Sequence, residues 1–456
     1  MLITTQGIDM LLSATLRAGR RLGALALGGI VLLSGCDSLL QADDPDIITS
    51  ANSASGAAAL KNGVIARFNS VTAGAQQPDG IFQFGGLLAD EWASGDTFEQ
   101  RNTVDARTTN VTNSFLAGPF RNLQRIRTEG RTAIDALRTY APTPASNIAL
   151  MFNLTAFAEI LMGETFCNGI PFSEPTPAGI VFGDPVTVDS VFSRASNDAD
   201  SALANNGGAD AVRMTSLAQL IKGRALLNRG QFAAAAAAVA AVPTAFVYQT
   251  TYSLNSGDNQ NWALNVSSKR YILPNSEGIN GMNWRTAADP RLPVDPAAHT
   301  AFDGTVGSHF NQILWAVRTD PVIVASGIEA RLIEAEAALQ ANDFLNFIAK
   351  LNVARGTKAG LANLADPGTT AARVDLLFRE RAFWMFGTGH RLGDLRRLIR
   401  QYSRGAETVF PTGAWFKGGS YGTDVNLPIS IDELNNGNIP QNPTTTAQST
   451  CIDRNA

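Results

Sequence analysis

The chain has 456 residues, enough for two or three average domains or for one large domain with insertions. Hydrophobic residues make up 45% and charged residues 17%, which is typical of a globular protein with a sizeable core. The formal net charge is -4, and basic residues cluster only near the start and over 391–404, so the composition argues against a nucleic-acid partner.

The first residues have the pattern of a secretory signal. Three arginines, at 17, 20 and 21, precede an apolar run over residues 22–33. This run is too short to span a bilayer and fits the apolar region of a signal peptide. Met10 is an alternative start, because the basic region counted from Met1 is long.

The apolar run ends in Leu33-Ser34-Gly35-Cys36, the pattern of a bacterial lipoprotein signal. We expect cleavage of residues 1–35 and lipidation of Cys36, with the acidic stretch 36–50 as a tether. Two or three lipid chains anchor a protein stably where one does not. The alternative is an ordinary cleavage site followed by a buried cysteine.

Helical periodicity dominates the rest of the chain. It predicts helices over 52–72, 81–92, 115–140, 146–163, 187–205, 322–339, 344–355 and 371–386. The stretch 93–110 is polar and irregular, and residues 164–186 form a Gly/Pro-rich loop. The sequence therefore predicts a mainly α fold.

Two segments repeat one another. Ala225–Phe232 and Ala337–Phe344 share a small residue, then Gly230 or Asn342, then a phenylalanine two residues later. Gly and Asn tolerate the left-handed turn that joins two antiparallel helices. This is the logic of tetratricopeptide helix pairs, and the alternative is two unrelated helical hairpins.

Between these segments lies an insertion over about 243–321, rich in Asn, Gly, Ser and Pro. It contains strand-like runs at 245–252 and 269–273, and half of the six tryptophans, at positions 262, 284 and 315. Long loops inside a compact protein are usually functional.

The residues of common catalytic sites do not form their usual patterns. The three histidines, at 299, 309 and 390, have no zinc-site spacing. The chain has no nucleophile elbow, phosphate-binding loop or dinucleotide fingerprint. We therefore expect no enzyme activity, no cofactor and no metal.

Near the C-terminus we expect an apolar helix that ends near Met385, because Gly387 and Gly389 favour a turn. A second helix restarts at about Arg391. Asp394 lies three residues from both Arg391 and Arg397, so it is placed to pair with either. We expect a helix-turn-helix corner tied by ion pairs.

The motifs of this corner resemble the C-terminal signature of SusD/RagB-type outer-membrane lipoproteins. They are Glu380-Arg381, Gly389-His390-Arg391 and Asp394-Leu395-Arg396-Arg397. The tail, with Leu427-Pro428-Ile429 and Gln441-Asn442-Pro443, is similar to the family's closing segment. Thr388 stands where the family usually has Glu, which puts one local ion pair in doubt.

The resemblance implies a single helical domain over 51–456, with tetratricopeptide-like pairs as scaffold and the insertion at 243–321 as an elaborated face. It implies a surface-exposed nutrient-binding lipoprotein that acts as the lid of a SusC-like TonB-dependent transporter in the outer membrane. The ligand is an oligosaccharide or, alternatively, a peptide. Two rivals remain: a helical-repeat adaptor without a small ligand, whose tryptophans are all buried, and an extracellular glycan-degrading enzyme with a facing carboxylate pair.

The stretch from Asp90-Glu91-Trp92 to Phe98 resembles the segment that carries part of the ligand surface in this family. Aromatic rings stack on sugar rings, while Asn and Arg bind the hydroxyl groups. Our candidate ligand-binding residues are Trp92, Asn102, Trp262, Trp284 and Arg285. The alternative for each tryptophan is core packing.

The chain has three cysteines, and lipidation of Cys36 leaves Cys167 and Cys451 as a pair. Because the mature protein lies in an oxidising compartment, we expect these two to form a disulfide. The alternative is two free thiols.

Overall fold

The computed structural model describes residues 52–74, 79–439 and 450–456. Residues 51–456 form one compact unit. The predicted signal peptide, the lipidation of Cys36, the tether over 36–50 and the Gln441-Asn442-Pro443 motif lie outside the described residues.

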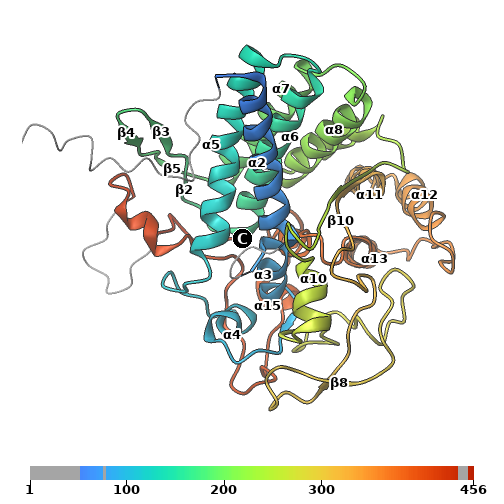
Figure 1. Ribbon diagram of the computed structural model, residues 1–456. Coiled ribbons are helices and arrows are strands. Elements are labelled where there is room, and N and C mark those ends of the chain that lie inside the picture. The colour runs from blue at the N-terminus through green and yellow to red at the C-terminus, as the bar shows by residue number, and fades with distance from the viewer. Residues whose placement is uncertain (1–51, 75–78, 440–449) are drawn as a thin grey trace, which may run out of the picture. The chain divides into compact units, whose positions relative to one another are not determined.

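Five long helices follow one another in space as they do in the sequence. They are α2 (Ala54–Ala73), α5 (Ala117–Tyr140), α6 (Ser146–Thr165), α7 (Val188–Ala204) and α8 (Ala211–Asn228). Each packs against the next, and Figure 1 shows α2, α5, α6 and α7 side by side. The resulting scaffold is mainly helical, as the sequence predicts.

Helix α6 is the centre of this scaffold. It is the one described helix whose length and apolar composition would suit a membrane span, but 89% of its apolar window is buried inside the protein. It contacts α5, α7 and α8, and its neighbours approach closely through glycines. A Cβ at Gly130 of α5 would lie 2.4 Å from Thr155 Oγ1, and one at Gly163 would lie 2.7 Å from the Phe192 ring. α6 is thus a core helix.

The two repeated segments form matching helix pairs. α8 turns into α9 (Phe232–Val239), and α11 (Gly327–Gln340) turns into α12 (Phe344–Arg355). The turn residues Gly230 and Asn342 have φ of 70° and 58°, so both take the left-handed conformation that the sequence indicates. Helix α9 also packs on α11, which joins the two pairs into one scaffold.

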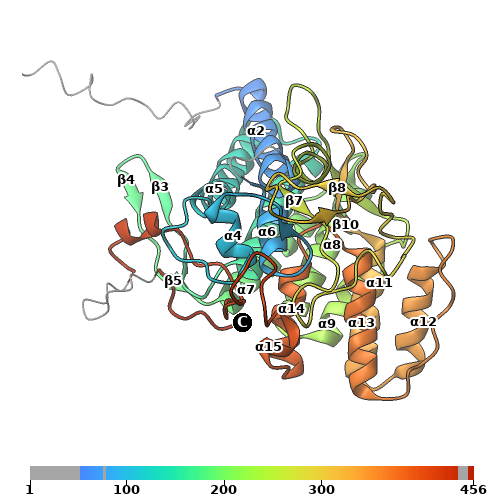
Figure 2. The ribbon, with the colours of Figure 1, turned by 90° about the horizontal axis from the view of Figure 1, so that it is seen from below.

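The remaining helices surround these pairs. Figure 2 shows α11, α12 and α13 (Thr370–Trp384) together at one side. Further helical segments are α3 (Ile81–Leu88), α4 (Glu99–Asp105), α10 (Gln260–Trp262) with a π-helical turn at Ala263–Ser267, α14 (Arg391–Tyr402), α15 (Ala406–Val409) and a 3-10 helix at Ile431–Asn435.

The strands are short and antiparallel, and they pair two by two. The pairs are β1 (Ala93–Ser94) with β7 (Tyr271–Ile272), β2 (Ile170–Pro171) with β5 (Pro185–Val186), β3 (Glu174–Thr176) with β4 (Gly179–Val181), β6 (Val247–Thr250) with β10 (Val322–Ser326), and β8 (His299–Thr300) with β9 (Ser308–His309). Three of these pairs, β1–β7, β6–β10 and β8–β9, involve the predicted insertion or its borders. The other two, β2–β5 and β3–β4, lie within the predicted Gly/Pro-rich loop.

Three predicted elements differ from the observed ones. The helix predicted over 322–339 begins only at Gly327, because Val322–Ser326 pairs with β6 and Ser326 caps the helix through Glu329 N. The second helix, predicted to end at 92, ends at Leu88. The stretch 93–110, predicted to be irregular, contains β1 and α4.

The corner between α13 and α14 is tied by ion pairs, with one partner different from the prediction. Asp394 accepts hydrogen bonds from Arg397 at 2.9 Å and from Arg381 at 2.8 Å. Arg391 instead binds Asp90 through two hydrogen bonds of 2.6 and 2.8 Å. Asp90 lies 301 positions away in the sequence, so helical spacing gave no signal of this pairing.

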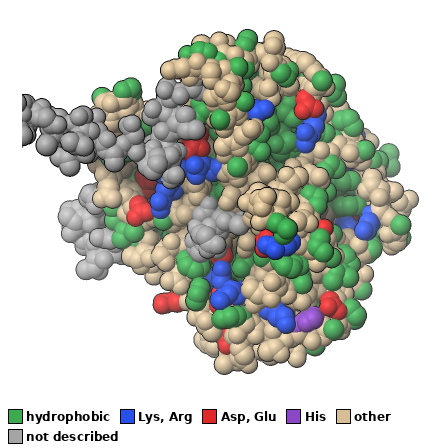
Figure 3. Space-filling view, viewed as in Figure 1, with side chains coloured by type: hydrophobic (Ala, Val, Ile, Leu, Met, Phe, Trp, Pro, Cys, Tyr) green, Lys and Arg blue, Asp and Glu red, His purple; other side chains and the backbone are tan. Residues whose placement is uncertain are grey.

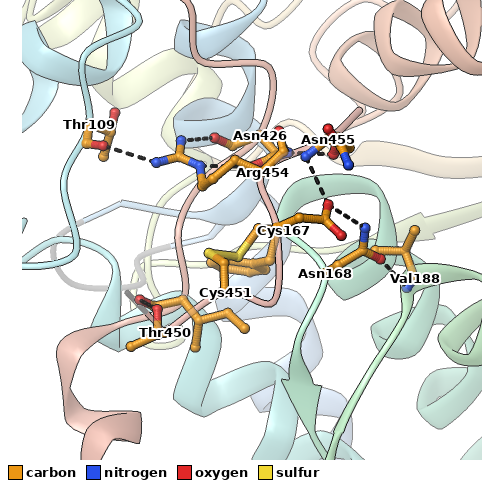
Figure 4. The surroundings of a disulfide bond; sticks show 12 residues. Thr109, Cys167, Asn168, Val188, Asn426, Thr450, Cys451, Arg454 and Asn455 are labelled. Atoms are coloured by element: carbon orange, nitrogen blue, oxygen red, sulfur yellow. Dashed lines mark hydrogen bonds between the residues drawn. A yellow bond between two sulfur atoms is a disulfide. The ribbon is translucent and has the colours of Figure 1, made fainter. Parts of the chain in front are cut away.

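A disulfide joins Cys167 to Cys451, as the cysteine count predicts. Cys167 follows α6 and Cys451 lies in the closing segment of the chain (Figure 4). The same segment hydrogen-bonds to the protein on both sides of the bridge: Ile452 N donates to Asn168 O at 2.8 Å, and Thr450 Oγ1 donates to Ile429 O at 2.6 Å. The chain's last residues are therefore part of the folded unit.

Candidate functional site

One cavity of the described structure is mostly apolar. It has a volume of about 750 Å³ and lies between the β6–β10 pair and the end of α13. Its wall includes Phe246, Leu314, Trp315, Ile323, Trp384 and Phe386. The polar groups in its lining include His390 and Glu329, whose Nε2 and Oε1 atoms lie 3.1 Å apart as a buried ion pair. We call this the apolar cavity.

Two further cavities adjoin one another, because both are lined by Arg285 and Phe310. The first has a volume of about 560 Å³ and is lined chiefly by 272–278, 305–310 and 416–417. The second has a volume of about 420 Å³ and is lined chiefly by 288–296. We call the two together the aromatic groove.

A lysine holds one end of the aromatic groove together. Lys417 Nζ donates to Asn102 Oδ1 at 3.0 Å and to Asp303 Oδ2 at 3.1 Å, and also to the carbonyl oxygen of Asp96. These contacts join three segments that are far apart in the sequence. They also fix the backbone next to Phe416, whose side chain is 45% exposed although large apolar side chains are usually buried.

Other aromatic rings near the groove carry stacked arginines. The Arg270 guanidinium lies 3.6 Å from the ring centre of Phe302 and 5.0 Å from that of Phe98. The Arg285 guanidinium lies 4.3 Å from the ring centre of Phe310. Phe98 and Phe302 are 45% and 49% exposed. The region thus presents several rings to solvent, each held by polar neighbours in a fixed place.

A pair of buried carboxyl groups forms the wall behind Lys417. Tyr421 Oη donates to Glu277 Oε1 at 2.7 Å, while Ser94 N and Trp415 Nε1 each donate to Asp105 Oδ2 at 3.1 Å. Burial, and then the charge of Asp105, raise the pKa of Glu277 well above its usual range. Burial raises the pKa of Asp105 to about 6. At neutral pH the pair therefore holds one proton, and its net charge is -1 instead of the -2 of two ionised carboxylates.

The structure contradicts the predicted ligand role of two tryptophans. Trp92 and Trp284 are 1% and 0% exposed, so neither offers a ring face to a ligand. Trp284 Nε1 donates to Asp90 O at 2.6 Å, and both indoles pack against Phe386 at ring distances of 4.9 and 5.0 Å. Phe386 lies two residues after the end of α13. The sequence around Trp92 and Trp284 is polar and gave no sign of this contact with a distant part of the chain.

The other three predicted residues have different locations. Arg285 lines both halves of the aromatic groove. Asn102 lies at the edge of the groove, where it accepts a hydrogen bond from Lys417. Trp262 is half-buried and packs on the core. The sequence therefore identified two polar residues of this region, whereas each tryptophan packs in or on the core.

The phenylalanines of the groove were missed by sequence reasoning. Phe310 and Phe416, which line the groove, and Phe302, on which Arg270 stacks nearby, come from loops without helical or strand periodicity. One signal was available: residues 415–422 combine three aromatic residues with three glycines, a composition that places rings on an exposed turn. Among the described residues, no group of three or more His, Cys, Asp or Glu side chains is placed to hold a metal ion.

Charge on the face seen in Figure 3 is mixed. Basic and acidic side chains are interspersed over the described part of this face, and hydrophobic ones form scattered patches between them. Such a surface lacks the continuous basic stripe that binds a nucleic-acid backbone.

Comparison with known proteins identifies the fold. No protein-family model matches the chain, and neither does any curated protein sequence. Solved structures do match over most of their length. A SusD superfamily protein from Parabacteroides distasonis has a TM-score of 0.64 at 14% identity, covering 86% of this chain and 99% of its own. A putative sugar-binding protein from Bacteroides vulgatus has a TM-score of 0.63 at 13% identity, covering 87% and 99%. A SusD-like carbohydrate-binding protein from B. vulgatus has a TM-score of 0.57 at 13% identity, covering 75% and 83%.

Proposed function

We propose that this chain, which has the fold of SusD superfamily proteins, is a nutrient-binding lipoprotein of the outer membrane whose aromatic groove binds an oligosaccharide. The observation that carries the proposal is that the exposed ring of Phe416 and the half-buried ring of Phe310 line the same polar cavity. Two of the similar structures are named as sugar- or carbohydrate-binding proteins, which supports the same class of ligand.

The groove is suited to a sugar because its apolar and polar parts alternate. Phe416 and Phe310 offer ring faces to the apolar faces of pyranose rings. Asn275 and Ser308, which also line the first cavity, offer hydrogen-bonding groups to the hydroxyls. The contacts of Lys417 position these loops before a ligand arrives, and such preorganisation lowers the entropy cost of binding.

Titration calorimetry with a panel of oligosaccharides tests the site. Phe416→Ala should weaken binding of the best ligand about tenfold, which corresponds to about 1.4 kcal/mol. Phe182→Ala is the matched control, because Phe182 is also 45% exposed but lies beside strand β4 and lines neither half of the groove. Both variants should keep the melting temperature of the parent protein. Equal affinity for the two variants would rule out the groove as the binding site.

The proposed anchor is tested by Cys36→Ala. If Cys36 carries the lipid, the variant should move from the membrane fraction to the soluble fraction after cell fractionation in low-salt and high-salt buffer. Retention of the variant in membranes washed free of partner proteins would contradict lipidation.

We also propose that the protein acts as the lid of a TonB-dependent transporter, with the lipidated tether as the hinge. Purification from outer membrane in mild detergent should recover a large β-barrel protein in comparable amount. Recovery of this chain alone, from membranes that contain the transporter, would overturn the lid role while leaving ligand binding intact.

A second candidate ligand is a peptide, and the apolar cavity favours it. Its volume and its Phe, Trp and Ile lining suit one large apolar side chain. Peptides rich in Leu and Phe should then bind with affinity that Ile323→Lys abolishes, since Ile323 is 42% exposed and lines the cavity. Oligosaccharide binding should be unchanged by this substitution.

The two alternative functions, a helical-repeat adaptor and a glycan-degrading enzyme, make different predictions for the purified protein. An adaptor without a small ligand binds neither oligosaccharide nor peptide. An enzyme releases new reducing ends from a glycan, and its two carboxyl groups face each other across the sugar at about 5–9.5 Å. Asp105 and Glu277 are instead buried behind the groove, and neither is exposed to a ligand on both sides. An assay for reducing ends during a long incubation separates binding from turnover.

A further inference from the structure

Arg285 stands between the two halves of the aromatic groove. Its guanidinium lies 4.3 Å from the ring centre of Phe310, and both residues line both cavities. The side chain is exposed, and no carboxylate among the described residues forms an ion pair with it. Because the guanidinium has five N–H donors and no hydrogen-bond partner for its side chain is found among the described residues, it can bind a ligand in the groove.

The other ionised side chains that line the groove have hydrogen-bonding or ion-pair partners. Lys417 pairs with Asp303 at 3.1 Å. Asp289 pairs with Arg291 at 2.6 Å, and Asp295 forms a hydrogen bond with His299 Nε2 at 3.0 Å. The carboxyl pair of the wall holds one proton at neutral pH. Arg285 is therefore the groove's one cation without a counter-charge among the described residues.

Arg270 provides an internal comparison. It also stacks on a phenylalanine, at 3.6 Å from the ring centre of Phe302, but it pairs with Asp96 at 2.6 Å. Stacking of arginine on a phenylalanine thus occurs twice in this region. Of these two arginines, Arg270 has a carboxylate partner and Arg285 has none among the described residues, so the N–H groups of Arg285 are available to a ligand.

We propose that the oligosaccharide bound in the aromatic groove is anionic, and that Arg285 binds its carboxylate or sulfate group at the junction of the two cavities. This inference rests on the proposed function and names the ligand class of the same site. Arginine suits the role because its planar fork binds carboxylate and sulfate-like oxyanions through two hydrogen bonds. The position between two cavities means that sugar units flank the charged one on both sides.

The test uses the mature protein and matched pairs of oligosaccharides in titration calorimetry at neutral pH. One pair is a hexagalacturonate and its carboxyl-reduced form, and the other is a κ-carrageenan hexasaccharide, whose only charged groups are sulfates, and its desulfated form. We expect at least one anionic member to bind tenfold or more tightly than its neutral counterpart. The pair that shows the difference tells carboxylate from sulfate. The difference should shrink in 0.5 M NaCl, because salt screens exposed charges.

Variants then assign the effect to one residue. Arg285→Gln should remove the preference, so that the anionic member and its neutral counterpart bind the variant with affinities within twofold of each other. Arg285→Lys should retain part of the preference, since it keeps the charge but loses the planar fork. Arg121→Gln is the control for net charge, because Arg121 is exposed on α5 and lines neither half of the groove.

The outcomes separate this inference from the proposed function. If neutral oligosaccharides bind and the anionic forms bind no more tightly, the inference is overturned and the proposed function stands. A preference that survives Arg285→Gln also overturns it. If no oligosaccharide of either kind binds, both the inference and the proposed oligosaccharide function fail.

Discussion

Asp394 lies between two arginines in the core, and this arrangement decides its charge. Burial alone would raise the pKa of Asp394, but Arg381 and Arg397 together hold it well below its usual range. The group is therefore ionised at neutral pH, and its pairing stabilises the fold above the pKa of an unfolded aspartate. That contribution is lost as the pH falls through the lowered pKa of the folded protein.

Removal of this charge should be costly. Asp394→Asn leaves two buried arginines with less counter-charge, and we expect a loss of about 3–5 kcal/mol in the free energy of unfolding by urea. Asp375→Asn is the matched control, because Asp375 pairs with Arg404 at 2.8 Å but its side chain is 65% exposed. It should cost about 0–1 kcal/mol. Similar losses for the two variants would contradict the role assigned to Asp394.

Glu91 shows the opposite behaviour. It is fully buried, Gly387 N donates to its Oε1 at 2.8 Å, and its Oε2 has no hydrogen-bond partner among the described residues. Burial raises the pKa of Glu91 to about 8. The folded protein therefore binds a proton that the unfolded chain releases above about pH 4.5, so this group's contribution to stability falls as the pH rises toward 8.

Glu91→Gln should remove this pH dependence, since glutamine keeps the acceptor for Gly387 N and does not titrate. Between pH 5.5 and pH 7.5, the slope of unfolding free energy against pH should become less negative by up to about 1.4 kcal/mol per pH unit. Urea unfolding at several pH values measures it. An unchanged slope would show that Glu91 titrates near its ordinary pKa.

The sequence indicated only the local part of these residue networks. The Asp394–Arg397 pair follows from helical spacing, because three residues separate its members. Arg391 with Asp90, and Glu91 with Gly387, join segments about 300 residues apart. The same limit explains Trp92 and Trp284, whose buried partner Phe386 was not identifiable before the chain was folded.

At the scale of elements, helix pairs were predictable because their signals are local. The turn at Gly230 and Asn342 needs a residue that tolerates positive φ, and both positions carry one. Strand β10 was not predictable in the same way. The run Val322-Ile323-Val324 continues a helical apolar pattern into α11, yet its β-branched residues pair with β6 once that strand is present.

Close helix packing gives a prediction at this scale. Gly223 of α8 faces α9, and a Cβ added there would lie 2.3 Å from Val239 Cγ1. Gly223→Ala should force the two helices apart and lower the free energy of unfolding by about 1–3 kcal/mol. Gly63→Ala in α2 is the control, because a Cβ at Gly63 meets nothing within 4 Å. It should raise stability by up to about 1 kcal/mol. Changes of the same sign in both variants would contradict this packing.

For the whole molecule, the scaffold was easier to predict than the site it carries. Helix periodicity and the C-terminal motifs indicated the fold over the described chain. The groove is built from β1, β7, the β9 region and the 416–417 turn, and of these the sequence indicated only the strand-like run that contains β7. Its rings are phenylalanines held at the surface by long-range contacts, such as that of Lys417 with Asp303. Sequence reasoning therefore found Arg285 and Asn102 by residue type and missed the rings beside them.

The disulfide acts on the same scale, because Cys167 and Cys451 are 284 positions apart. In the chain-entropy account, a closed loop of this length stabilises the folded state by about 4–5 kcal/mol, although measured values are often smaller. The bridge also fixes the closing segment, whose Asn168–Asp453 and Arg454–Asn426 side-chain hydrogen bonds measure 2.9 and 3.0 Å (Figure 4).

In a Cys36→Ser background, which removes the lipidated thiol, Cys451→Ser should therefore lower the melting temperature by several degrees. Reducing agent should lower the parent protein to the same value and leave Cys451→Ser unchanged. Mass spectrometry without reduction should show a peptide pair that joins the two cysteines. Two thiols that alkylate readily in the folded protein would contradict the bridge, and would leave the tail held by hydrogen bonds alone.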